Sequence, residues 1–263
     1  MTHALHEELW SRLGEELLLP LTQAALAELD PQRTQATGEL NLRAIPYLAT
    51  LHLLDCMAVS VQANACGRHA VAICLARQCV EALTLLDVGC QPHAYAAELL
   101  SAWEAGRMTQ GQLRARLEKD VWLRYGHGLW EEPWQNFFAN LARAVQPYAH
   151  YSPELKNWQF SILDYELAPH QLKGNVVKPV LVAVGPNTYD RLKGTRVMLL
   201  LSLILWTLGR LLVANGRAGD LSQRVMEFGT ALGSSSLLFE RGDWGSQLVP
   251  HMFFKKEAGW RGE

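Results

Sequence analysis

The chain has 263 residues, of which 49% are hydrophobic and 19% are charged, so it carries enough apolar material for one large folded domain. Its 24 Lys and Arg are balanced by 26 Asp and Glu, and the formal net charge is −2. This balance argues against a globally basic nucleic-acid binder, although it leaves room for a local basic cleft. The charged fraction lies below the usual quarter, which indicates a surface suited to self-association.

The N-terminus and the cysteines both predict a cytoplasmic protein. The opening, MTHALHEELWSRLGEELLLPL, is acidic and lacks the basic start, apolar run and small-residue cleavage site of a secretory signal. The five cysteines lie in apolar helical stretches without CxxC pairing, so we predict buried, reduced thiols rather than disulfides or a zinc site. They are Cys56, Cys66, Cys74, Cys79 and Cys90.

The segment 196–216 is the most apolar run of the chain. Its uncharged part, Val197 to Gly209, is shorter than the roughly 20 residues that a membrane-spanning helix needs. We therefore predict a buried core helix or a helix at a dimer face, and no stable membrane insertion. A membrane-associated helical protein is the less favoured alternative.

Helical periodicity extends through most of the remaining chain. Pro20 is expected to kink or divide the first helix, because a proline inside a helix removes a backbone hydrogen bond. The predicted helices span residues 6–30, 41–66, 67–89, 94–106, 109–126, 133–146, 152–168, 188–215 and 220–232. Their predicted N-caps include Asn41, Thr109, Ser152 and Asn187.

One stretch, residues 172–187, breaks the helical pattern. It is rich in β-branched residues and contains Pro179, which predicts an extended segment or small hairpin near 174–186. The predicted fold class is therefore all-α, a bundle of seven to nine helices with one short extended or β-hairpin insertion. We divide it into an N-terminal helical segment (1–40), the bundle (41–216) and a C-terminal helix and tail (217–263).

Two charged residues interrupt the predicted central helix 67–89. Arg77 and Glu81 stand four residues apart and therefore on one helical face. A charge pair in a buried helix costs desolvation free energy unless it is well paired. Two interpretations follow: an ion pair at the edge of the core, or a polar pocket that faces another helix.

Known sequence motifs for cofactors and metals are absent. No glycine-rich phosphate loop follows a strand, and no nucleophile elbow of the G-x-S-x-G type occurs. Glu166 and His170 do not form the Glu-x-x-His element of di-iron bundles. We therefore expect no metal site and no cofactor.

The most suggestive stretch for chemistry is LARAVQPYAHYSPELKNW, residues 141–158. It places Arg143 one turn before a proline break and His150 just after the break. A permanently charged guanidinium and a titratable imidazole are the groups that metal-free phosphodiester chemistry needs. The polar and aromatic neighbours of this pair are Tyr148, Tyr151 and Ser152.

The string RAVQPYAH resembles the HEPN superfamily of helical-bundle proteins, whose ribonucleases carry an arginine followed a few residues later by a histidine at a helix end. LARQCVEALTLL followed by YAHYS is similar to bacterial HEPN-like proteins of unknown function. Those proteins pair an Arg-x-x-x-Glu helix with a later helix that starts near Ser and His. The resemblance covers residues 41–214, and Ala144 stands where a polar residue commonly follows the arginine.

The resemblance implies a metal-independent endoribonuclease of defence or toxin type that cleaves RNA by 2′-OH transesterification. His150 would be the general base or acid, and Arg143 would stabilise charge on the phosphate. Arg77 would bind a second phosphate, with Glu81 holding its guanidinium. The tyrosines Tyr148 and Tyr151, together with Trp158, would stack on unpaired bases. Such sites form across a symmetric homodimer, for which the long apolar helix from Thr188 would supply the interface.

The alternative function is a non-catalytic HEPN-like module, a sensor or adaptor that binds a partner protein or a small ligand. In that case Arg143 is a solvated residue and His150 satisfies a helix end. The nine tryptophans fit a ligand groove or a protein interface as well as they fit RNA.

Overall fold

The computed structural model describes residues 15–29, 40–152, 155, 158–159, 161–167, 170–172, 175–177, 180–185 and 189–234. It is an all-α helical bundle with a short strand insertion, as predicted. The α-helices are α2 (Glu15–Leu29), α3 (Leu40–Ala65), α4 (His69–Cys90), α5 (His93–Glu104), α6 (Gln110–Asp120), α7 (Trp134–Val145), α9 (Arg191–Ala214) and α10 (Leu221–Gly233). The structure also has three short 3-10 helices: η3 (Trp122–Arg124), η4 (Leu129–Glu131) and η5 (Gln146–Ala149).

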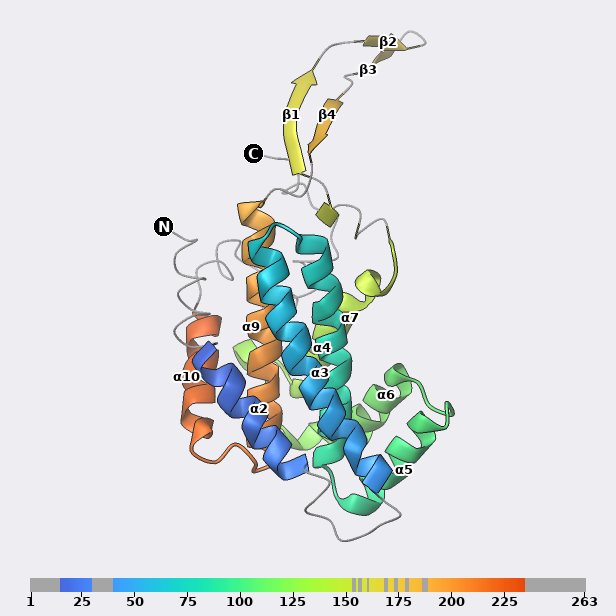
Figure 1. Cartoon of the computed structure of the whole chain (residues 1–263), viewed down its shortest axis with the longest axis vertical. Helices are drawn as coiled ribbons and strands as arrows, with labels where there is room; N and C mark the ends of the chain where they lie inside the picture. The colour runs from blue at the N-terminus through green and yellow to red at the C-terminus, as the bar shows by residue number, and fades with distance from the viewer. Residues whose placement is uncertain are drawn as a thin grey trace.

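Helix α4 lies at the centre of the bundle. It packs against α3, α9, α7 and α5, and its side chains are buried on most of its circumference, as the sequence predicts for a helix that is apolar on nearly all sides. Figure 1 shows α3 and α4 running side by side, with α2 and α10 on one side of the bundle and α5 and α6 on the other. Leu21 of α2 and Phe228 of α10 belong to the same hydrophobic core as Leu86 of α4.

Helix α9 is a core helix of the bundle. Every residue from Val197 to Gly209 is buried, which confirms the core-helix prediction and leaves that run no apolar face for a dimer contact. Two segments, Ala44–Ala65 and Lys193–Ala214, are long and apolar enough to cross a membrane by length and composition. In the most apolar 18-residue stretch of the second segment, 78% is buried inside the bundle. Core helices of soluble proteins pass the same test, so this property assigns no membrane.

Local sequence signals set several helix ends. Thr109 caps α6 as predicted: its hydroxyl accepts from the Gln112 N–H at 3.3 Å, and the Gln112 side chain accepts in return from the Thr109 N–H at 2.8 Å. Gly67 ends α3 in a left-handed conformation, φ 75°, which lets the Arg68 N–H bond to the Ala63 carbonyl at 2.8 Å. These ends fix the tight α3–α4 turn and the start of α6.

Two predicted helix starts differ from the structure. Helix α3 already includes Asn41, which is therefore not its cap. Helix α9 begins at Arg191, and Asp190 acts as its cap because its Oδ1 accepts from the Lys193 N–H at 3.0 Å. The predicted cap Asn187 lies outside the described residues. Pro20 lies inside α2, which continues without division from Glu15 to Leu29.

The prediction of a helix from residue 152 to 168 is wrong in its second half. Residues 161–167 form strand β1, which pairs antiparallel with β4 (Val180–Gly185). A smaller pair joins β2 (His170–Leu172) to β3 (Asn175–Val177). The β-branched partner strand decides the conformation here, because strand propensity is mainly a matter of cross-strand pairing.

Candidate functional site

A small polar pocket lies where α4, α6 and the end of α7 meet. Its volume is about 40 Å³, room for roughly three water molecules. Its polar walls come from Arg77 and Glu81 of α4, Arg114 of α6 and Gln146 of η5. The apolar part is lined by Val80, Ala142 and Val145.

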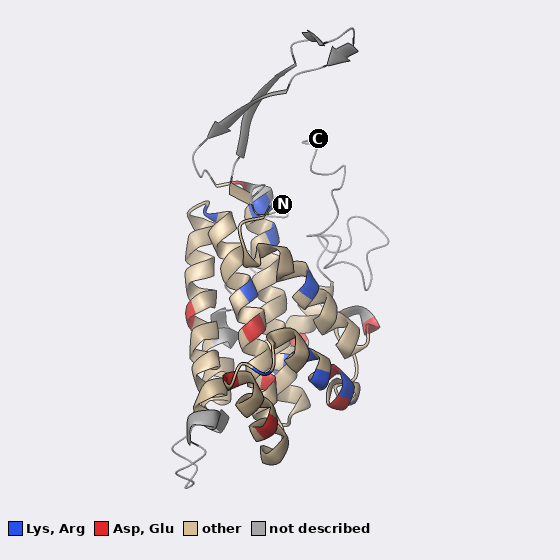
Figure 2. Ribbon diagram, turned by 90° about the vertical axis from the view of Figure 1, so that its right-hand side faces the viewer, with Lys and Arg blue, Asp and Glu red and all other residues tan. Residues whose placement is uncertain are grey.

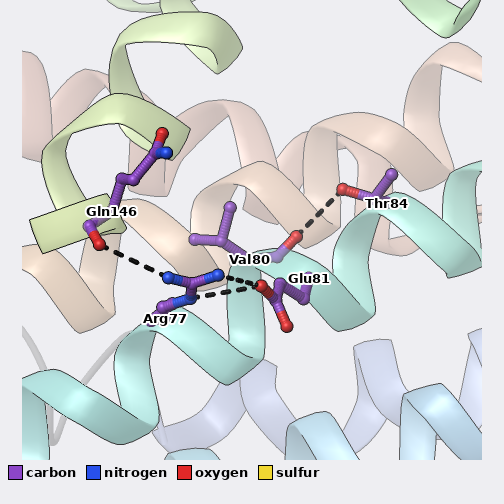
Figure 3. Close-up of polar contacts among 5 residues, drawn as sticks. All are labelled: Arg77, Val80, Glu81, Thr84 and Gln146. Carbon is purple, nitrogen blue, oxygen red and sulfur yellow. Dashed lines mark hydrogen bonds and ion pairs between the residues drawn. The ribbon is translucent and has the colours of Figure 1, made fainter. Parts of the chain in front are cut away.

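Arg77 is held in this pocket by three hydrogen bonds (Figure 3). Its Nη2 and Nε donate to Oε1 of Glu81 at 2.6 and 3.1 Å, and its Nη1 donates to the Gln146 carbonyl at 3.3 Å. Both charged side chains remain 23% exposed. The two interpretations of Arg77 and Glu81 therefore coexist: they form an ion pair at the edge of the core, and that pair lines a pocket that faces other helices.

Arg114 adds a second positive charge to the pocket. Within the described part of the chain its guanidinium makes no hydrogen bond or ion pair. Burial lowers the pKa of Arg114; the Glu81 carboxylate acts in the opposite direction, and Arg77 adds to the lowering. Because an arginine stays protonated in proteins, the pocket holds two cations against one carboxylate.

Arg114 is a pocket residue that the sequence analysis did not single out. Leu113 and Leu117 of the same helix are fully buried. Arg114 directly follows Leu113 and precedes Leu117 by three residues, so it borders the buried stripe rather than opposing it. That helical spacing was the available signal.

The predicted catalytic pair does not lie in this pocket. Arg143 and His150 are both exposed, and neither lines the pocket. The Nη1 of Arg143 donates to Oδ1 of Asn140 on the same helix at 3.1 Å. Ala142 and Val145 face the pocket, so helical geometry turns Arg143, which lies between them, to another side. The structure thus does not bring Arg77, Glu81, Arg143 and His150 together in one pocket.

Of the aromatic residues predicted to stack on bases, Tyr148 and Trp158 are buried and Tyr151 is exposed. Tyr148 is only 2% exposed, and its ring packs edge-on against Trp158 with centroids 6.2 Å apart. The Trp158 Nε1 donates to the Tyr148 hydroxyl at 3.3 Å, so neither ring is available for a base. Tyr151 is 72% exposed. Ser152 has a local role, because its hydroxyl accepts from the Leu155 N–H at 3.1 Å and caps the next turn, as predicted.

A buried carboxylate, Asp87 of α4, forms a polar network that the sequence did not reveal. Its Oδ1 accepts from the Tyr125 hydroxyl at 2.6 Å, and its Oδ2 accepts from the Trp122 Nε1 at 2.7 Å. The side chains of Gln91 and Asn215 also donate to the Tyr125 oxygen, each at 2.8 Å. Burial raises the pKa of Asp87 to about 6 against the effect of these donors. The network joins α4, η3 and the end of α9. We interpret it as structural, because Asp87 and its donors Tyr125 and Trp122 are buried.

A second buried carboxyl belongs to Glu132, which is 5% exposed. Its Oε1 accepts from the Asn140 Nδ2 at 2.8 Å, and burial raises its pKa to about 7. The residue before it, Glu131, has a φ of 58°, a left-handed conformation that is uncommon for a non-glycine residue. Asn140 also holds Arg143, so the chain of contacts runs from a buried acid to an exposed guanidinium.

A buried histidine ties α3, α4 and α9 together. The Nδ1 of His69 contacts Oδ1 of Asn64 at 2.7 Å, and its Nε2 accepts from the Asp190 N–H at 3.0 Å. The Asn64 Nδ2 donates to the Gly194 carbonyl at 2.9 Å, which leaves its Oδ1 to accept. His69 is therefore neutral with its proton on Nδ1. Burial lowers its pKa to about 4.

The described residues contain no group of three His, Cys, Asp or Glu side chains that could hold a metal ion. Lys and Arg are intermixed with Asp and Glu over the bundle, rather than gathered in one basic stripe, in the part of the chain that Figure 2 colours by charge. No protein-family model, curated protein or solved structure matched the chain when it was compared with them. The pocket and its contacts are therefore the features of the chain that bear on its function.

Proposed function

We propose that this chain is a helical binding module and that the α4–α6–α7 pocket binds an anionic group, with phosphate as the favoured chemistry. The observation that carries this proposal is the half-buried Arg114 guanidinium, which has no hydrogen-bond partner among the described residues. A cation that is partly removed from water is destabilised until a partner replaces its hydration. A tetrahedral oxyanion would supply that partner.

The pocket is built for one such group. The ion pair with Glu81 and the bond to the Gln146 carbonyl fix the Arg77 guanidinium in place. A preorganised arginine loses less side-chain entropy on binding, and paired guanidinium groups match the oxygen spacing of phosphate. A volume of about 40 Å³ suits a single phosphate or carboxylate rather than a whole nucleotide, so the remainder of a ligand would lie outside on the surface.

A second candidate is the HEPN-like ribonuclease. The observation in its favour is that Arg77 bonds to the carbonyl of Gln146, which lies in the segment between Arg143 and His150. A phosphate in the pocket would therefore border the segment that carries the exposed imidazole. In this proposal His150 takes the proton of a ribose 2′-OH, Arg143 stabilises the phosphorane, and a cytoplasmic homodimer is the expected setting.

The first experiment tests binding. Isothermal titration of the full chain with inorganic phosphate, and separately with a short unstructured RNA, compares wild type with Arg114→Gln and Arg77→Gln. Arg116→Gln is the matched control, because Arg116 lies on the same helix but pairs with Asp120 at 3.2 Å outside the pocket. We expect the pocket variants to weaken binding by about tenfold or more, since a hydrogen bond to a charged group contributes roughly 1.5–3 kcal/mol. Equal affinity of Arg114→Gln and Arg116→Gln would refute the site.

The second experiment tests catalysis. RNA cleavage by wild type, Arg143→Ala and His150→Ala is followed with EDTA present. Cleavage that resists EDTA and is lost in both variants supports the ribonuclease. Binding that depends on Arg114 without cleavage supports the binding module alone.

A further inference from the structure

Helix α3 turns an apolar face to solvent. It packs against α2 and α4, and in Figure 1 it crosses the front of the bundle between them. In the most apolar stretch of its segment Ala44–Ala65 only 39% is buried, against 78% in α9. Leu48 is 58% exposed and Val59 is 49% exposed. A contiguous apolar surface of this kind, unlike a single exposed side chain, marks an interaction site.

The exposed side chains of α3 follow one line along the helix. Leu48, His52, Asp55, Val59 and Gln62 are all exposed, and the steps between them alternate between four and three residues. Residues at this spacing share one face of an α-helix, as they do in the contact line of a coiled coil. Asp55 is the only Asp, Glu, Lys or Arg between positions 44 and 65. The line is therefore polar at its centre and apolar on each side of it.

The order of side chains along this line is its own complement. Leu48 and Val59 lie equally far from the midpoint between positions 53 and 54, and so do His52 and Asp55. A twofold axis at that midpoint relates two antiparallel copies of α3 so that Leu48 faces Val59 of the second copy and His52 faces its Asp55, each pair occurring twice. With a rise of 1.5 Å per residue, the apolar pairs lie about 8 Å and the polar pairs about 2 Å from the axis along the helix.

We propose that the exposed line of α3 is a homodimer interface, on which a second copy of this chain packs antiparallel in the register that pairs Leu48 with Val59 and His52 with Asp55. The imidazole opposite the carboxylate supplies charge complementarity at the centre, and the flanking apolar side chains leave water. The anion pocket is lined by residues of α4, α6, α7 and η5 and by none of α3. The interface thus goes beyond anion binding and does not depend on it.

The same charges argue against two other occupants of this face. A parallel second copy in register would place Asp55 opposite Asp55, and like charges at a contact oppose association. A lipid surface would receive the Asp55 carboxylate at the middle of the apolar line, where a charged group is costly to bury. The antiparallel copy is the arrangement in which this carboxylate meets an imidazole.

Sedimentation equilibrium of the full chain, over a range of concentrations, measures the monomer–dimer dissociation constant. Leu48→Asp and Val59→Asp should each raise that constant tenfold or more, because each places a carboxylate in the apolar contact. Leu123→Asp is the matched control, since Leu123 is 69% exposed on η3, outside α3. A wild-type chain that stays monomeric, or a control variant that weakens the dimer as much as Leu48→Asp does, would overturn the proposal.

A mixing experiment tests the antiparallel register itself. His52→Asp alone places two carboxylates opposite each other, and Asp55→Lys alone places an ammonium opposite His52, so each variant should dimerise several-fold more weakly than wild type. In an equal mixture, the new carboxylate of one chain faces the new ammonium of the other, and dimers of the two variants should form in preference to dimers of either one. Both substitutions are at exposed positions, and circular dichroism checks that the helices are retained.

The outcomes of the mixing experiment separate the possible partners of this face. Recovery of dimerisation on mixing supports the register. A mixture that dimerises no better than its components overturns it, even where wild type is a dimer. Association that appears only with phosphatidylcholine vesicles would assign the face to lipid and would overturn the proposal.

Discussion

The Tyr125 hydroxyl donates a 2.6 Å hydrogen bond to the carboxylate of Asp87, across 38 positions of the chain. Asp87 is completely enclosed, and its charge is offset only by neutral donors. A buried carboxylate in such surroundings depends on every donor, because a lost bond inside the core is not replaced by water.

Tyr125→Phe should therefore destabilise the protein by roughly 1.5–3 kcal/mol at pH 7, the usual contribution of a hydrogen bond to a charged group. Urea unfolding at pH 7 and at pH 4 measures the change, which should shrink at pH 4, where Asp87 binds a proton. Tyr95→Phe is the matched control, since the Tyr95 hydroxyl donates to Asp120 at 3.2 Å on the exposed surface. An equal loss of stability in both variants would contradict the special role of the buried pair.

Glu132 should make the protein less stable as pH rises. Its pKa is raised from 4.5 in the unfolded chain to about 7 in the folded one, so between these values the folded state holds a proton that the unfolded state has lost. The free energy of unfolding therefore falls from about pH 4.5 to about pH 7 and then levels off. Glu132→Gln keeps an acceptor for Asn140 and should flatten this part of the curve. If the variant and wild type show parallel curves, Glu132 titrates normally.

His69 should affect stability in the opposite direction to Glu132, so that its contribution to the free energy of unfolding increases as pH rises. Its pKa is lowered from 6.5 to about 4, so between these values the unfolded chain binds a proton that the folded chain does not. Stability contributed by neutral His69 is present above pH 6.5 and is lost as pH falls toward 4. An NMR titration of the His69 ring carbons should show neutral imidazole, protonated on Nδ1, down to about pH 4. A midpoint near 6.5 would show that the contacts to Asn64 and Asp190 do not form.

Gly229 of α10 permits a close approach to Trp206 of α9. A Cβ at this position would lie 2.3 Å from the indole Nε1 of Trp206, which is buried without a hydrogen-bond partner among the described residues. Gly229→Ala should destabilise the protein by about 1–3 kcal/mol, as overpacking of a core does. The loss of stability is measured by thermal unfolding of the variant and of wild type.

Gly111→Ala is the control for that substitution. Gly111 lies in α6, and a Cβ there would meet only the Thr109 hydroxyl at 3.9 Å. It should stabilise the protein by roughly 0.5–1 kcal/mol, because alanine has the higher helix propensity. A gain of stability in both variants would mean that α10 can move away from α9.

Those parts of the bundle could be predicted from sequence whose conformation or burial is determined by residues within one short segment. The apolar run from Val197 to Gly209 required burial whatever its partners were, and the Thr109 capping box involves only Gln112. The strand at 161–167 could not be predicted in this way, because its conformation depends on pairing with Val180–Gly185. Spatial neighbours that are distant in sequence decide such a segment.

In the candidate site, too, contacts between residues close in sequence could be predicted, whereas contacts between different helices could not. The spacing of Arg77 and Glu81 made their ion pair predictable, and the structure also shows them lining a pocket. The spacing of Arg114 from Leu113 and Leu117 indicates that it borders the buried face of α6, but which residues it meets there depends on how α6 packs against α4. Arg143 and His150 are close in sequence, yet the direction of a side chain at a helix end depends on the turn that follows.

The position of α9 in the core has a consequence for synthesis on the ribosome. Helix α4 ends at Cys90, but α9, which covers one of its sides, starts only at Arg191. At about 5–20 residues per second, roughly 5–20 s pass between the translation of the two helices. During that interval the apolar surface of α4 that α9 will cover is open to chaperones and to other nascent chains. The native core closes only after α9 has left the exit tunnel, so the central layer of the bundle folds later than the contacts between α3 and α4 can form.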